Sequence, residues 1–243
     1  MLDVLRKRAP PELDINVLIR PRGGDFCYSE TEYAVMVKDI ESAKYAGASG
    51  VVLGVLNPDG TVDIPRTKNL VEIARPMSVT FHRAFDVTRD AEEALEACVE
   101  CGCDRILTSG MAPSAAEGAP VIKRLVDAAK GRISIMAGAG ITVQNVADTL
   151  VATGVDEVHA SGRVKRAGRM DYRPDRIVYM GGEKVNEPDV EYSIREVTVD
   201  KVKAYMESIK RGWLVANTLK VAKSGGEGSR PAASFDDLHQ TGS

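Results

Sequence analysis

The sequence lacks a strong excess of either charge and has no long hydrophobic run. Its 243 residues include 32 lysines and arginines against 35 aspartates and glutamates, for a net charge of −3. This balance provides neither the basic surface of a nucleic-acid-binding protein nor a polybasic patch for anionic membranes. The longest apolar runs, such as residues 50–56, are far shorter than the roughly 20 residues of a membrane span. We therefore expect neither nucleic acid nor a membrane as a partner.

Cysteine is also scarce, and no secretory signal is apparent. The chain has 4 cysteines, in no spacing typical of a secreted disulfide-rich domain, so a reducing compartment is expected. The charged first residues are not followed by the apolar stretch of a signal peptide. The sequence therefore predicts a cytoplasmic protein. With 44% hydrophobic residues, it can bury one large core or two modest ones.

Short runs rich in β-branched residues alternate with amphipathic segments along most of the chain. The predicted strands are residues 15–19, 50–56, 78–81, 105–108, 133–136 and 157–160. The predicted helices are residues 30–46, 66–74, 91–101, 119–129 and 143–153. Because the strands are unbroken apolar runs, we expect an α/β fold of parallel βαβ units with the sheet buried on both faces. Six strands fit a doubly wound sheet or part of an eight-stranded barrel.

The last third of the chain has a different composition. Residues 161–190 are rich in glycine, arginine and proline without a clear period, which predicts a long loop. Residues 202–219 predict a final helix, and the glycine- and serine-rich stretch after it predicts a flexible segment. The expected organisation is one domain over residues 1–220 and a flexible C-terminal tail over residues 221–243.

Polar residues follow each predicted strand, at the edge where parallel sheets bind ligands. The candidate ligand-binding residues are Arg20, Arg22, Asp25, Arg83, Ser109, Gly138, Gly140 and His159. Guanidinium groups bind carboxylates and phosphates with paired hydrogen bonds, so this rim suits an anionic ligand. The alternative is that the arginines bridge neighbouring strand ends through Asp25 or Asp86.

Two histidines end predicted strands. His82 can be a general acid or base, a metal ligand or a packing residue, and it has Arg83 and Asp86 beside it. We take His82 and Asp86 as the candidate catalytic residues. His159 lies two residues after Glu157, so strand alternation points both side chains the same way. A packing role for His159 is an equal alternative.

The turn at residues 136–142 is rich in glycine and precedes a predicted helix, which Thr142 could cap. Such turns hold phosphate in the last units of some barrels. The alternative is a tight turn that only needs glycine for its geometry. A glycine pair alone is a weak signal, so both interpretations stay open.

Three cysteines lie close together at the end of a predicted helix. Cys98 and Cys101 can share one helix face, whereas Cys103 lies beyond Gly102. This helix end is remote from the carboxyl ends of the strands, so we expect buried packing thiols rather than a metal site. Cys27 lies near the rim, but a single cysteine makes a poor metal site.

Several motifs resemble the signature of the copper homeostasis protein CutC family. They span roughly residues 13–210 and include VLIRPRGGDF at 17–26, VTFHRAFD at 79–86, RILTSG at 105–110, MAGAGI at 136–141 and EVHAS at 157–161. The resemblance implies a cytosolic TIM-like barrel, with copper binding or trafficking as its role, and it leaves an enzymatic role open. The rim residues that it implies are Arg20, Arg22, Asp25, His82, Arg83 and Asp86.

The chain departs from the family pattern before its first predicted strand. The resemblance implies two further strand–helix units there, which carry the cysteines associated with copper. We therefore expect an incomplete TIM-like barrel that lacks the first two units of the family. Its unpaired strand edges would favour self-association, so a homo-oligomer is expected.

The resulting hypothesis is a copper-homeostasis-type protein that binds copper or a small anionic ligand at the carboxyl ends of its strands. Copper(I) prefers thiolate and thioether donors, and only Cys27 is expected near this rim, so the sequence identifies no ligand set for copper. The alternative is a barrel enzyme that acts on a phosphorylated or carboxylated small molecule, with His82 as acid or base.

Overall fold

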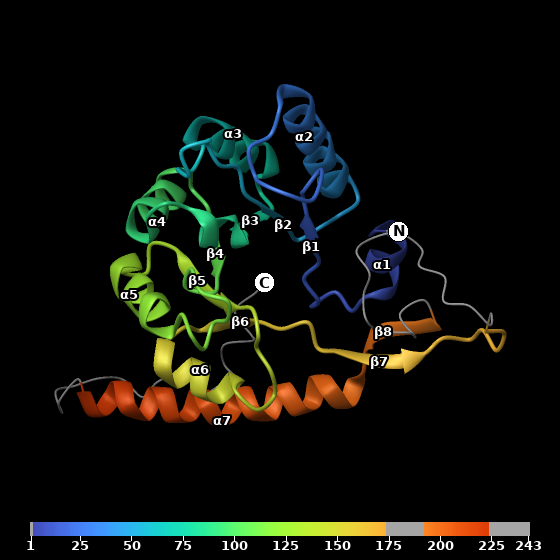
Figure 1. The fold of residues 1–243 in the computed structure, drawn as a ribbon, viewed down its shortest axis with the longest axis vertical. Helices are drawn as coiled ribbons and strands as arrows, with labels where there is room; N and C mark the ends of the chain where they lie inside the picture. Colours follow the sequence, from blue (N-terminus) through green and yellow to red (C-terminus); the bar gives the residue numbers. More distant parts are fainter. Residues whose placement is uncertain (1, 174–191, 224–243) are drawn as a thin grey trace.

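The computed structural model describes residues 2–173 and 192–223, and its centre is one curled parallel sheet (Figure 1). The strand order is β1-β2-β3-β4-β5-β6. The strands are β1 (Asn16–Leu18), β2 (Gly50–Leu53), β3 (Ser78–Phe81), β4 (Arg105–Thr108), β5 (Ser134–Gly138) and β6 (Glu157–His159). All six predicted strands are confirmed. β2 is shorter than predicted because the backbones of Val55 and Leu56 hydrogen-bond to loop segments instead of a neighbouring strand.

Helices follow the strands and cover the outer side of the curl (Figure 1). They are α2 (Glu30–Tyr45), α3 (Ile64–Ala74), α4 (Ala91–Glu100), α5 (Ala119–Ala129) and α6 (Val146–Thr153). Asn145 rather than Thr142 is the N-cap of α6, which begins at Val146. Thr142 instead caps the turn that leads into this helix, since its Oγ1 accepts a hydrogen bond of 3.3 Å from the Asn145 amide and its own amide donates to Asn145 Oδ1 at 2.7 Å.

The two faces of the sheet have different surroundings. Outward-facing side chains such as Val51, Leu53 and Phe81 are fully buried beneath the helices. The inner face is only partly covered, because glycines occupy several inward positions and polar side chains occupy others. The expectation of a sheet buried on both faces is therefore wrong for the inner face. The expected incomplete barrel is confirmed, since the six strands curl without closing and leave β1 and β6 as the ends of the sheet.

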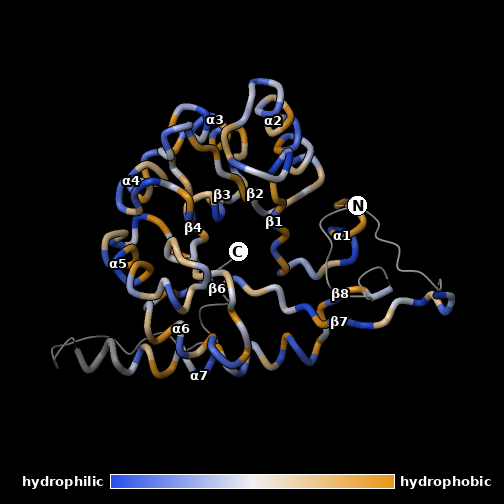
Figure 2. The backbone as a smooth tube through the Cα atoms, viewed as in Figure 1, coloured by the Kyte–Doolittle hydropathy of each residue, from blue (hydrophilic) through white to orange (hydrophobic). Residues whose placement is uncertain are grey.

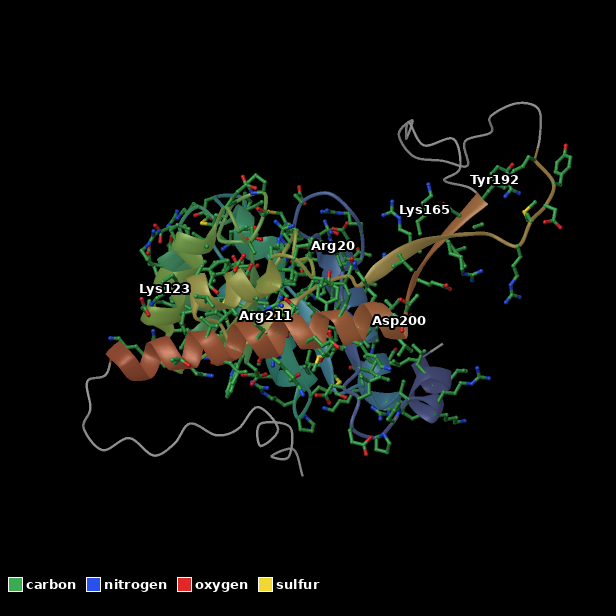
Figure 3. All side chains as sticks on the ribbon, turned by 90° about the horizontal axis from the view of Figure 1, so that it is seen from below. Arg20, Lys123, Lys165, Tyr192, Asp200 and Arg211 are labelled. Carbon is green, nitrogen blue, oxygen red and sulfur yellow. The ribbon has the colours of Figure 1, made fainter. Side chains whose placement is uncertain are left out.

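The C-terminal part contains structure that the sequence pattern did not indicate. The predicted loop at 161–190 begins instead with β7 (Arg163–Ala167), which pairs antiparallel with β8 (Ser193–Val197). Figure 3 shows this hairpin, with Lys165 on it, projecting beyond the barrel. The hydrophobic pattern missed the hairpin because its residues are mostly exposed. The remainder of the predicted loop lies outside the described residues.

The final helix is longer than predicted, since α7 extends over Val199–Lys223. It runs along α6, and the Tyr205 hydroxyl donates a hydrogen bond of 3.0 Å to the Ile141 carbonyl. Hydrophilic and hydrophobic residues alternate along α7 (Figure 2). Among the described residues, no helix is long and apolar enough to cross a membrane. The predicted tail lies outside the described residues from position 224 onward. An additional helix, α1 (Leu2–Arg8), lies beside β1.

Candidate functional site

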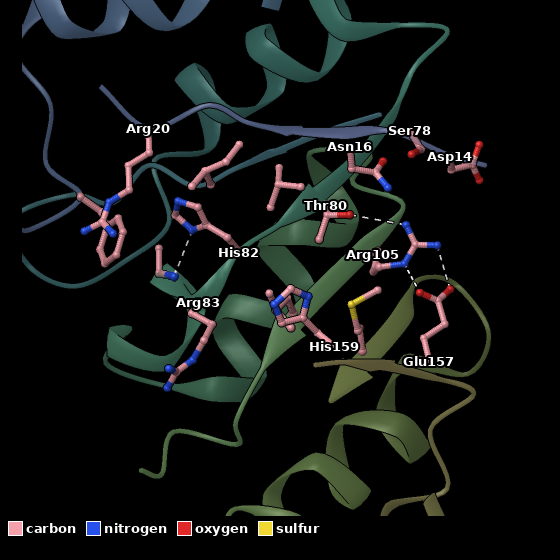
Figure 4. Close-up of a pocket in the computed structure, with 16 residues that line it drawn as sticks. Asp14, Asn16, Arg20, Ser78, Thr80, His82, Arg83, Arg105, Glu157 and His159 are labelled. Carbon is pink, nitrogen blue, oxygen red and sulfur yellow. Dashed lines mark hydrogen bonds and ion pairs between the residues drawn. The ribbon is translucent and has the colours of Figure 1, made fainter. Parts of the chain in front are cut away.

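The inner face of the sheet lines a cavity of about 580 Å³. Of the residues predicted from the sequence, those that line it are Arg20, His82, Arg83 and His159 (Figure 4). The predicted residues outside its lining are Arg22, Asp25, Asp86, Ser109, Gly138 and Gly140. The cavity therefore brings residues from the ends of β1, β3 and β6 together, while the other predicted residues support them.

His82 directly follows β3 and is 6% exposed. Its Nδ1 accepts a hydrogen bond of 3.1 Å from the Ala84 amide, which begins a short 3-10 helix (Arg83–Val87). Burial lowers the pKa of His82 to about 4, so the ring is neutral at pH 7. Since Nδ1 accepts, the ring proton lies on Nε2. This nitrogen is buried and has no hydrogen-bond partner among the described residues.

The position of His82 depends on a glycine in the neighbouring strand connection. A Cβ atom on Gly54 would lie 2.6 Å from Cε1 and 2.7 Å from Nδ1 of His82. Such contacts are far inside van der Waals distance, so any side chain at position 54 would push the imidazole away. Gly54 therefore makes the space that the ring occupies.

Arg20 and Phe26 line the cavity together with His82, and Figure 4 shows Arg20 on the same side of the cavity as His82. The Phe26 ring centroid is 5.0 Å from that of His82, and the Arg20 guanidinium lies 4.7 Å from the Phe26 centroid. Nη2 of Arg20 also donates a hydrogen bond of 2.7 Å to the Gly24 carbonyl. A cation and an unpartnered N–H donor thus lie next to each other at the carboxyl end of the sheet.

Arg22 has a different role from Arg20, although both belong to the same motif. Its Nε donates to Glu32 at 2.6 Å, its Nη1 to the carbonyls of Gly23 and Asp25, and its Nη2 to the Cys27 carbonyl and the Asp25 carboxylate. Hydrogen bonding to Glu32 and Asp25 raises the pKa of Arg22. All five donors of this guanidinium are engaged. Arg22 and Asp25 therefore hold their own loop in shape, rather than bridging neighbouring strand ends.

Asp86 is also a structural anchor. Its side chain is 6% exposed and accepts hydrogen bonds from the Thr108 hydroxyl at 2.5 Å and from the Ser109 amide at 2.9 Å. It also binds Nε of Arg83 at 2.7 Å, and the Ser109 hydroxyl accepts from Nη2 of Arg83 at 3.0 Å. Asp86 and Ser109 thereby fix the guanidinium of Arg83 at the cavity. Asp86 contacts Arg83 rather than the imidazole of His82.

The glycine-rich turn after β5 packs closely against its neighbours. A Cβ on Gly138 would lie 2.5 Å from Cδ1 of Leu107, so this glycine gives room to a side chain of β4. Gly140 has a φ of +69°, and its carbonyl accepts a hydrogen bond from Asn145. The Thr142 amide, which could face a phosphate, already donates to Asn145. The phosphate interpretation stays a prediction.

The end of the cavity opposite His82 was not found from the sequence. Arg105, the first residue of β4, forms a two-point ion pair with Glu157, the first residue of β6, with Nη2 and Oε1 2.8 Å apart (Figure 4). Hydrogen bonding to Glu157 raises the pKa of Arg105. Both Glu157 and His159 line the cavity, as the strand alternation predicted. Partial burial lowers the pKa of His159.

The cysteines lie away from this cavity. Cys98, Cys101 and Cys103 are buried in the core, which agrees with a packing role. Burial raises the pKa of Cys101 to about 12 and also raises that of Cys27, so both are thiols at neutral pH. Within residues 2–173 and 192–223, no group of three or more His, Cys, Asp or Glu side chains is placed to hold a metal ion.

Comparison with known proteins gives the family. A family model described as the CutC family matches residues 2–164. The family protein CutC of Parabacteroides distasonis is 46% identical over 200 residues, which cover 82% of this chain and 81% of that protein. This chain belongs to the CutC family. The mouse (Mus musculus) copper homeostasis protein cutC homolog is 45% identical to this CutC-family chain over 192 residues, which cover 79% of the chain and 69% of the mouse protein.

Solved structures agree with the half-barrel fold of this CutC-family chain. A copper homeostasis protein CutC from Streptococcus agalactiae matches with a TM-score of 0.58 and 34% identity, over 60% of this chain and 72% of that one. An aldolase, QR15, matches with a TM-score of 0.50 and 20% identity, over 65% of this chain and 72% of that one, which shows likeness of fold alone.

Proposed function

We propose that this protein is a cytosolic, copper-homeostasis-type member of the CutC family that binds a small anionic ligand at the carboxyl end of its half-barrel. The observation that carries the proposal is the buried Nε2–H of His82, which has no partner among the described residues and lies beside Arg20. A buried donor without a partner costs about 1–3 kcal/mol. A ligand oxygen that reaches Nε2 would satisfy this donor and meet a guanidinium at the same time.

The charges at this end of the cavity support an anion rather than a cation. Arg20 has no carboxylate partner among the described ion pairs, and Arg83 presents a guanidinium that Asp86 has already oriented. His82 is neutral, because its pKa is about 4. It can therefore donate a hydrogen bond without a change of protonation state. A carboxylate or phosphate oxygen suits such a set of donors.

The enzymatic alternative has less support. A general acid or base works best when its pKa lies near the working pH, whereas burial lowers the pKa of His82 to about 4. The Nδ1 atom of His82 accepts from a backbone amide, not from a proton-holding carboxylate. Asp86, the proposed partner, is engaged by Arg83, Thr108 and backbone amides. These contacts favour a binding role for His82 over proton transfer.

Copper(I) is a second candidate ligand, favoured by a donor that the sequence did not place. Met136 and His159 line this cavity, so one thioether and one imidazole are available there, whereas His82 offers no free lone pair because Nδ1 accepts from the Ala84 amide and Nε2 carries the proton. Copper(I) binds thioether and imidazole donors. In this case copper would be cargo, and the fit rests on Met136 rather than on a thiolate.

Titration calorimetry on the purified protein at pH 7 tests the proposal, with inorganic phosphate and simple carboxylates as probes. We expect Arg20→Gln to weaken binding by about ten- to a hundredfold, because it removes one charge-assisted hydrogen bond of about 1.5–3 kcal/mol. The control is Arg124→Gln, since Arg124 lies on α5 away from the cavity. If none of these anions binds, the proposal is refuted. The second candidate would be supported if copper(I) binds stoichiometrically under anaerobic conditions and the Met136→Leu variant loses this binding.

A further inference from the structure

The end of the cavity opposite His82 is polar in a position where barrels of this kind usually pack branched apolar side chains. Asn16, Ser78, Thr80, Arg105 and Glu157 all line it. Asn16, Ser78, Arg105 and Glu157 are the first residues of β1, β3, β4 and β6, so they form a floor at the amino-terminal ends of the strands. We infer that the cavity binds a polyhydroxylated small anion, with the charged group at His82 and Arg20 and the hydroxyl groups on this floor. The inference rests on the anion-binding role proposed above.

The floor is built around a glycine. Asn16, Gly50 and Ser78 lie side by side in register across β1, β2 and β3. A Cβ on Gly50 would lie only 2.1 Å from Oδ1 of Asn16 and 2.4 Å from Oγ of Ser78. The two polar groups therefore extend over the same glycine from opposite sides. An amide and a hydroxyl each donate and accept, which matches the double character of a ligand hydroxyl.

The ion pair beside them has capacity for further hydrogen bonds. Arg105 is 23% exposed and Glu157 is 31% exposed at the side chain. Three of the five Arg105 donors bind Glu157 and the Thr80 hydroxyl, which leaves two for a ligand. A partly buried ion pair contributes little net stability, because desolvation offsets the attraction. Its presence inside the barrel is better explained by a polar ligand than by folding.

The spacing along β3 sets the size of the ligand. Thr80 and His82 point to the same side and are two residues apart, or about 7 Å along a strand. Apolar side chains also line the cavity, among them Leu18, Val52 and Leu107. They suit the C–H faces of a carbon chain. The cavity of about 580 Å³ lies within the usual range for small-molecule sites of roughly 300–1,000 Å³. A six-carbon sugar acid or a sugar phosphate fits these limits.

Calorimetric titration of the whole chain at pH 7 with three six-carbon probes tests the inference. Gluconate carries both a carboxylate and hydroxyls, hexanoate only the carboxylate, and sorbitol only the hydroxyls. We expect gluconate to bind at least about tenfold more tightly than hexanoate, and sorbitol to show no measurable binding. Glucose 6-phosphate in a fourth titration distinguishes a phosphate from a carboxylate as the charged group.

Floor variants show which contacts recognise the hydroxyls. Ser78→Ala and Thr80→Val each remove one hydroxyl, and we expect each to weaken gluconate binding by about threefold to tenfold without changing hexanoate binding. Thr218→Val on the exposed side of α7 is the matched control. Circular dichroism of each variant confirms that it is folded.

Two outcomes overturn the inference and are distinguishable. The role of the floor is refuted if gluconate and hexanoate bind with equal affinity, or if the floor variants leave gluconate binding unchanged. In that case the anion site would still be upheld if the binding of both compounds is weakened by Arg20→Gln. If gluconate, hexanoate, glucose 6-phosphate and inorganic phosphate all fail to bind, the proposed anion-binding function is wrong and this inference is wrong with it.

Discussion

Arg20 and Arg22 are two residues apart in the sequence but have different surroundings in the fold. Arg20 stacks on Phe26 at the cavity, whereas all five donors of Arg22 bind the loop and Glu32. The sequence predicted that this motif gathers guanidinium groups at the rim. It could not say which arginine is engaged internally, because that depends on where Glu32 and the loop carbonyls lie in space.

At the same scale, His82 predicts a specific dependence of stability on pH. Its pKa is about 4 in the folded protein, against about 6.5 for an unperturbed histidine. Below pH 6.5 the unfolded chain takes up a proton that the folded chain does not. Stability is therefore complete above pH 6.5 and is lost as the pH falls towards 4, by about 3 kcal/mol in total. Urea unfolding followed by circular dichroism between pH 4.5 and 8 measures this loss.

The control for this pH dependence is His82→Asn. The amide oxygen can accept the hydrogen bond from the Ala84 amide, but the side chain does not titrate. In the variant, the pH dependence of the free energy of unfolding that comes from carboxylates should remain. The additional loss of stability that His82 causes between pH 6.5 and about 4 should disappear. Curves of equal slope for both proteins would show that His82 does not carry the effect.

At the scale of elements, the strands were predictable because helices bury their outward faces, and this burial leaves apolar residues at every second position of each strand. The hairpin of β7 and β8 was not, since its sequences Arg163–Ala167 and Ser193–Val197 are mostly exposed and mix charged with apolar residues. The floor of the cavity was missed for another reason. Ligand residues were sought after each strand, whereas Arg105 and Glu157 begin theirs. Polar residues at every second position of apolar strands were the signal that could have found them.

The packing of α7 on α6 depends on Gly212. A Cβ at this position would lie 2.6 Å from Cα and 2.8 Å from the carbonyl oxygen of Ala147, both backbone atoms of α6. Gly212→Ala should gain about 1 kcal/mol of helix propensity but lose about 1–3 kcal/mol to overpacking, so we expect a net destabilisation of about 1 kcal/mol. Urea unfolding measured at 222 nm gives the difference.

Gly23→Ala is the matched substitution for this test. No atom lies within 4 Å of a Cβ at Gly23, so its free energy of unfolding should change by less than about 0.5 kcal/mol. The emission of Trp213, next to Gly212 on α7, reports whether the helix has shifted. A stabilised Gly212→Ala protein with unchanged emission would mean that α7 does not pack as closely as the structure shows.

At the scale of the whole molecule, the half-barrel has two sheet ends. β1 pairs only with β2, and β6 only with β5, in the described part of the chain. Leu18 on β1 is 60% exposed although it points to the inner face, because no strand in the described ranges lies on its other side. Helix α1 lies beside β1 but makes no backbone hydrogen bond to it within these ranges. An edge with unpaired backbone groups and exposed apolar side chains favours pairing with another chain.

The open edge leads to the expectation that the purified protein self-associates, and that Leu18→Lys reduces this association. A lysine on an edge strand carries a charge that would have to lose its water when a second chain pairs there. Sedimentation velocity at several protein concentrations should show mass above the 26.2 kDa chain in the wild type and a shift towards the monomer in the variant. Val87→Lys adds the same charge on the 3-10 helix that follows the central strand β3, where the valine is 61% exposed, and should leave the distribution unchanged. If the wild-type protein is monomeric at all concentrations, the edge of β1 does not pair with a second copy. If both lysine substitutions reduce the association equally, the change is due to net charge alone.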